Sequence, residues 1–189
     1  LEGPGSPSDW NVSERGGGII KFIVSPVRRA QQTSEIMQQV IEEIIAEQNS
    51  ENIRLMTPRD REVLKAGGVI GPLNERGIED PVDFWLKNPN VLEGKSPEEI
   101  AKRLDELIIF LQKMADRLPA GEKIYYVGIT HEVPQAALLN QKSGKTLNEL
   151  GGKIENCEPI IVELQGNSDK GPVISFRNHE MKMDESNKN

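Results

Sequence analysis

The stretch Lys123–Leu139 constrains the fold most, because a strand pattern passes directly into a helix pattern within it. The run Ile124–Ile129 has the length and residue types of a buried strand. Thr130, His131 and Glu132 follow at once, and a segment of helical composition comes next. In open α/β folds, residues at the carboxyl ends of the strands line the ligand site. This stretch therefore predicts an α/β fold with a polar site at one edge of the sheet.

Strand and helix patterns alternate along the rest of the chain. Ile19–Val24 predicts a second buried strand, and an amphipathic helix pattern runs from Val27 to about Gln48. Its apolar stripe, which we interpret as core packing, contains Ile36, Met37, Val40, Ile41, Ile44 and Ile45. Ser96 and Glu99 form a capping-box pattern at the start of another helix, which ends near Leu118. This alternation predicts a three-layer α/β sandwich with a mostly parallel sheet.

The length of 189 residues predicts one domain over residues 1–189. Residues 1–18 are rich in Gly, Ser and Pro and predict an irregular opening, and the first residue, Leu1, suggests a truncated start. Pro159–Leu164 and Val173–Phe176 predict a hairpin, and residues 181–189 predict a frayed tail.

Composition limits the kinds of partner that the protein can bind and the cellular compartments that suit it. The formal net charge of -7, without a long basic run, argues against nucleic-acid binding. No apolar run approaches the ~20 residues that span a bilayer, so we expect no membrane insertion. The single cysteine, Cys157, excludes an intramolecular disulfide and favours a reducing, cytoplasmic location.

Two of the predicted strands lead into residues suited to an anion. Arg29 falls in the first turn of the helix after Ile19–Val24, and His131 follows the strand Ile124–Ile129. If the two strands are neighbours, Arg29 and His131 meet at one sheet edge. Guanidinium donors and a helix N-terminus together bind phosphate or carboxylate, and a histidine can bond a phosphoryl oxygen or move a proton. Solvated side chains are the alternative for both residues, and we prefer that interpretation for Arg28.

Four motifs resemble those of the histidine phosphatase (phosphoglycerate mutase-like) superfamily. SPVRRAQQTSEIM resembles its second motif, and VGITHE resembles its late motif, a strand that ends in a histidine. GKSPEEIAKRLDELIIFL resembles its Gly-Glu-Ser segment and following helix, although Lys95 replaces the usual glutamate. IENCEPIIVEL resembles the strand after the late histidine, so the ordered resemblance covers roughly residues 19–176.

The resemblance implies phosphoryl transfer through a phosphohistidine. It makes Arg29 a phosphate-binding arginine and His131 the second histidine of the site, and it implies neither metal nor cofactor. A phosphatase acting on a small-molecule phosphomonoester is favoured over a mutase, because the chain is short. The segment Gly67–Asn90 would cover the site and set the substrate. A homodimer is left open.

Three glutamates are candidates for the acid that protonates the leaving oxygen. Glu62 and Glu132 rank close together, and Glu75 ranks third, on their places relative to the motifs. Each of the three also suits a solvated surface carboxylate.

The Arg-His-Gly motif that carries the nucleophile in this superfamily has no counterpart here. The two histidines are His131 and His179, and neither stands between an arginine and a glycine. We therefore expect little or no turnover from this polypeptide alone. The alternatives are a non-catalytic module that binds a phospho-ligand or a protein, and an unrelated α/β fold.

Overall fold

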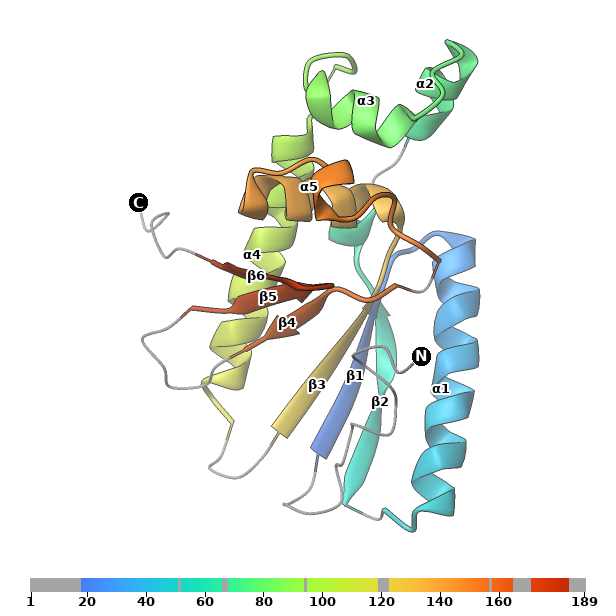
Figure 1. Ribbon diagram of the computed structural model, residues 1–189. Coiled ribbons are helices and arrows are strands. Elements are labelled where there is room, and N and C mark those ends of the chain that lie inside the picture. The colour runs from blue at the N-terminus through green and yellow to red at the C-terminus, as the bar shows by residue number, and fades with distance from the viewer. Residues whose placement is uncertain are drawn as a thin grey trace. The chain divides into compact units, whose positions relative to one another are not determined.

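The computed structural model describes residues 18–50, 52–65, 68–93, 95–118, 123–156, 158–164 and 171–183 (Figure 1). The chain forms two compact units. The first contains the residues up to Arg61 together with Arg117–Ile129, and the second contains Glu62–Asp116 and the residues from Thr130 onward. Cys157 and most of the predicted irregular opening lie outside the described residues, whereas Gly18 already begins the first strand.

A parallel sheet of three strands organises the first unit. Its strands are β1 (Gly18–Val24), β2 (Ile53–Asp60) and β3 (Lys123–Ile129), in the order β2-β1-β3. Val24 lies opposite Ile129 in the register of β1 and β3, and the backbone N–H of Ser25 donates to the Ile129 carbonyl at 2.9 Å. The predicted α/β class with a parallel sheet is therefore confirmed, and β1 and β3 end at the same edge.

Helix α1 (Arg28–Glu47) covers one face of this sheet (Figure 1). Met37 and Ile41 pack on a buried cluster made of Ile20, Phe22, Val24, Ala30 and Ile129. The prediction that the whole apolar stripe of this helix is core is wrong. Ile36, Val40 and Ile44 are 62%, 47% and 36% exposed. Each directly precedes a residue of the sheet-facing row, and one residue turns the side chain by about 100° around the helix, away from the sheet.

Two long helices, α4 (Pro97–Ala115) and α5 (Glu132–Ser143), pack together in the second unit. The Lys142 Nζ atom of α5 lies 2.5 Å from Asp105 Oδ2 of α4, and both side chains are largely buried. The predicted capping box is confirmed, since Ser96 Oγ accepts from the N–H of Glu99 and Glu99 Oε2 accepts from the N–H of Ser96. Shorter helical segments complete the helical part: η3 (Glu62–Leu64), α2 (Ile70–Glu75), α3 (Pro81–Lys87) and η4 (Asn148–Leu150).

The second unit also contains a separate antiparallel sheet, in the order β4-β5-β6. Its strands are β4 (Ile161–Glu163), β5 (Val173–Phe176) and β6 (His179–Lys182), so the predicted pairing of the first two is confirmed. Half of the described strands are therefore not in the parallel sheet, which differs from the expectation of one mostly parallel sheet.

The prediction of a frayed tail from residue 181 is wrong for Met181 and Met183. Both side chains are 6% exposed, and β6 pairs with β5 through Met181 opposite Ile174. Strand alternation puts Met181 on the buried face of β6, and the same alternation continues to Met183, which follows the strand. Residues 184–189 lie outside the described residues.

Candidate functional site

The end of β1 leads into a helix start that has no side-chain cap. Val27 occupies the N-cap position of α1 without a capping hydrogen bond, and the first turn contains no acidic residue. The helices α3 and α4, by contrast, are capped by Asp80 and Ser96. Uncapped N–H groups at a helix start attract anions. The local structure of α1 therefore suits a negatively charged ligand.

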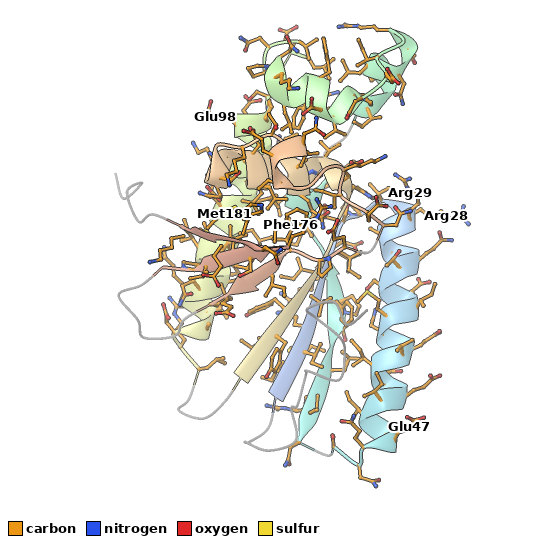
Figure 2. All side chains as sticks on the ribbon, viewed as in Figure 1. Arg28, Arg29, Glu47, Glu98, Phe176 and Met181 are labelled. Atoms are coloured by element: carbon orange, nitrogen blue, oxygen red, sulfur yellow. The ribbon has the colours of Figure 1, made fainter. Side chains whose placement is uncertain are left out.

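Arg28 and Arg29 add two positive charges at this helix start, and Figure 2 shows them at the opposite end of α1 from Glu47. Both arginines are exposed, and neither forms a salt bridge with a residue in the described part of the chain. Positive charge is unfavourable at the positive end of a helix dipole. An anion beside Arg29 would remove that conflict.

Ser25 lies between β1 and α1 and is fully buried. Its Oγ atom has no hydrogen-bond partner among the described residues. A buried hydroxyl without a partner is costly, and such groups in proteins are commonly satisfied by water or a ligand. Ser25 is thus a polar group at the end of β1 that a bound oxyanion could satisfy.

The end of β3 leads into the second cluster of candidate residues, all in the second unit. Thr130 Oγ1 donates to the Leu64 carbonyl at 2.8 Å, which ties η3 to the residue before His131. His131 is the N-cap residue of α5, with extended backbone and a half-buried side chain, and it makes no side-chain cap. Glu132 is the first residue of the helix itself.

Glu132 lies in an environment that raises the pKa of its carboxyl group. Its carboxyl group is half-buried, and this burial raises its pKa. Lys153 lowers the pKa of the same group, whereas Asp80 and Glu155 raise it. A glutamate in this setting keeps its proton to higher pH than an exposed one. These three charges were not singled out by sequence reasoning, because they come from segments far apart in the chain.

Glu62 and Glu75 have more solvated environments. The Glu62 side chain is 76% exposed and lies 3.6 Å from Lys65 Nζ within the same short turn. Glu75 is the exposed last residue of α2. Burial therefore distinguishes Glu132 from the other two candidates. The Thr130–Leu64 hydrogen bond nevertheless brings η3, which contains Glu62, next to the segment that leads to Glu132.

The segment expected to cover the site is described by the structure from Gly68 onward. It contains α2 and α3, and α3 packs on α5. Lys95, which replaces the family's usual glutamate, donates from Nζ to the Gly68 carbonyl at 3.3 Å, and its own carbonyl accepts from the fully buried Trp85 Nε1 at 2.7 Å. Asp80, at the start of α3, is close enough to α5 to act on Glu132.

His179 lies in β6, where its side chain is half-buried. Within the ranges that the structure describes, no group of three or more His, Cys, Asp or Glu residues could hold a metal ion. No helix in those ranges is long and apolar enough to cross a membrane.

No model of a known protein family matches the chain, and no curated protein and no solved structure matches it. The resemblance to histidine phosphatases therefore remains a hypothesis drawn from the motifs.

Proposed function

We propose that this chain is the phosphate-binding part of a phosphomonoester hydrolase of the histidine phosphatase type, with a phosphoglycerate mutase-like three-layer fold. Arg29 and His131 bind the phosphoryl group of a small-molecule phosphomonoester. Glu132 is the first choice for the acid that protonates the leaving oxygen, with Glu62 as the second.

The pairing of β1 with β3 carries this proposal. Val24 and Ile129 are register partners in parallel strands, so the segments that lead to Arg29 and to His131 leave the sheet at the same edge. Had the two strands been antiparallel neighbours, the proposal would have failed.

The chemistry follows from the residue types. The Arg29 guanidinium and the uncapped N–H groups of α1 supply donors to phosphoryl oxygens, and Ser25 Oγ lacks a partner among the described residues. In hydrolysis of this type, a P–N bond forms to a nucleophilic histidine, which residues 1–189 do not supply, while the P–O bond to the leaving group breaks. Glu132 gives its proton to the departing oxygen, and water then cleaves the P–N bond.

A second candidate function is a non-catalytic module that binds a phospho-ligand or a protein. The observation that favours it is the absence of an Arg-His-Gly motif among residues 1–189. Under this alternative, Arg29 and His131 keep their phosphate contacts and no turnover occurs.

Calorimetric titration with inorganic phosphate tests the site that both candidates share. We expect Arg29→Ala and His131→Ala each to weaken phosphate binding by roughly 10- to 100-fold, as expected for the loss of a charge-assisted hydrogen bond. Arg28→Ala is the matched control and should bind like the unchanged chain. Equal binding by all four proteins, or no binding by the unchanged chain, would overturn the proposal.

Two further measurements separate hydrolase from binding module. An in-frame coding sequence upstream of Leu1 that ends a strand in Arg-His-Gly supports the hydrolase, and a start codon just before Leu1 supports the module. Hydrolysis of p-nitrophenyl phosphate by this polypeptide, lost in His131→Ala, would contradict our expectation of little or no turnover.

A further inference from the structure

Arg177 makes more side-chain hydrogen bonds than any other arginine among the described residues. It lies in the turn between β5 and β6, and its half-buried guanidinium sits 4.7 Å from the centre of the buried Phe176 ring, which Figure 2 labels. Arg177 Nε and Nη2 donate to the two carboxylate oxygens of Glu158 at 2.7 and 2.9 Å. This bidentate pairing is the strongest form of arginine–carboxylate contact.

The same guanidinium binds the backbone of the segment that precedes Glu158. Nη1 donates to the carbonyls of Leu150 and Gly152 at 2.8 and 3.3 Å, and Nη2 donates to that of Lys153 at 2.9 Å. One side chain thus contacts both ends of the segment 150–158. Among the residues of this segment that the structure describes, none lies in a strand and only Leu150 lies in a helical turn.

Two backbone features show that the fold accommodates this contact at a cost. Arg177 has φ +52, a left-handed conformation that a non-glycine residue seldom adopts. Gly151 has φ +98, and a Cβ atom there would lie 2.8 Å from Arg177 Nη1. A glycine at 151 is therefore needed both for the local backbone and for the approach of the guanidinium.

The segment that Arg177 holds carries two of the charged residues that act electrostatically on Glu132, namely Lys153 and Glu155. The Lys153 carbonyl is a direct acceptor from Arg177. Glu155 is tied indirectly, because its backbone N–H donates to Glu158 Oε2 at 2.9 Å, the oxygen that also accepts from Arg177. Asp80, at the start of α3, is the remaining charged group that acts on Glu132.

We infer that Arg177 is a positioning residue, which holds Lys153 and Glu155 in place around the Glu132 carboxyl group. The role of Glu132 as an acid rests on the proposed function, but the contacts of Arg177 do not. A lysine at 177 could not replace it, because one ammonium group cannot reach a carboxylate and three carbonyls arranged around a planar fork.

The test is a double-substitution cycle read by NMR titration of the Glu132 side-chain carboxyl in the full chain. Lys153→Gln should shift the pKa of Glu132 upward, because it removes the positive charge that lowers this pKa. In Arg177→Gln, where the segment is no longer held, the same substitution at 153 should shift it much less. An equal shift in both backgrounds would overturn the inference.

Arg103→Gln is the matched control, since Arg103 is an exposed arginine of α4 whose side chain bonds just one group in the described part of the chain, the Glu99 carbonyl. It should leave the effect of Lys153→Gln unchanged. If Arg177→Gln does not fold, Glu158→Gln takes its place in the cycle, because it weakens the bidentate contact and keeps the guanidinium. Arg177→Lys should behave like Arg177→Gln. The cycle needs no phosphate, so a failure of phosphate binding would leave its result intact.

Discussion

At the scale of single residues, the candidate site separates into groups that the solvent surrounds and groups that the fold encloses. Arg29 and Glu62 are exposed, whereas Ser25 is fully buried and Glu132 is half-buried. Enclosed polar groups depend most on their neighbours. In surroundings of low polarity a hydrogen bond is stronger, and a polar group without a partner costs more free energy. Ser25 and Glu132 are therefore the residues whose behaviour should differ most from that of a free side chain.

Glu132 gives the first prediction. Burial raises its pKa in the folded chain, so the folded state keeps a proton that the unfolded state has already lost. Its contribution to stability therefore falls as pH rises from the ordinary glutamate pKa to the raised one, and is unfavourable above that window. Glu132→Gln removes this dependence. The free energy of unfolding of the variant minus that of the unchanged chain should therefore increase as pH rises through the window.

Urea unfolding at a series of pH values measures this difference. Glu62→Gln is the control, because that side chain is 76% exposed. A difference between Glu132→Gln and the unchanged chain that stays flat, or that shrinks as pH rises, would contradict the assigned environment.

At the scale of elements, helix α1 shows how an apolar stripe divides between core and solvent. Ile41 packs on the cluster beneath the helix, whereas Ile36 is 62% exposed. Ile41→Ala should lower the free energy of unfolding by about 1–2 kcal/mol, less than the 2–5 kcal/mol typical of a fully buried site. Ile36→Ala should change it by about 0.5 kcal/mol or less. Urea unfolding of the pair checks this, and equal losses would contradict the orientation of α1.

Strand β6 supports a prediction of the same kind at the end of the described chain. Met181 is 6% exposed and lies opposite Ile174, a fully buried residue of β5. Met181→Ala should cost about 2–4 kcal/mol of unfolding free energy, since it removes most of a buried side chain. Lys182→Ala, at the exposed neighbour, is the control and should cost about 0.5 kcal/mol or less. Equal losses of unfolding free energy in Met181→Ala and Lys182→Ala would contradict the burial of Met181 and support the predicted frayed tail.

At the scale of the whole molecule, the net charge of -7 opposes binding at the anion site that we propose. Binding must then rest on local donors rather than on the overall field, and the exposed Arg29 is the charge most open to screening. Raising the ionic strength from about 0.01 M to about 0.15 M shortens the Debye length from roughly 30 to roughly 8 Å. We expect phosphate affinity to fall several-fold over this range, and to fall less in Arg29→Ala. Calorimetry at the two ionic strengths checks this, and an equal fall in both proteins would remove Arg29 from the site.

The sequence by itself determined the features that depend on neighbours in the chain. Apolar runs bounded by turn residues located β1 and β3, and the pattern of Ser96 and Glu99 located the start of α4, because strand length, helix period and capping are local properties. The place of Arg29 in the first turn of the helix after β1, and that of His131 just after β3, followed from the same local signals.

Only the tertiary structure decided which of these elements meet. The parallel pairing of β1 with β3, the separate antiparallel sheet and the burial of Met181 each join residues that are distant in sequence or select one face of an element. Two other features also join residues that are distant in sequence. One is the electrostatic effect of Asp80, Lys153 and Glu155 on Glu132, and the other is the set of hydrogen bonds from Arg177 to Leu150 and Glu158. Such contacts follow from the packing of many side chains at once, and no local pattern of residues encodes them.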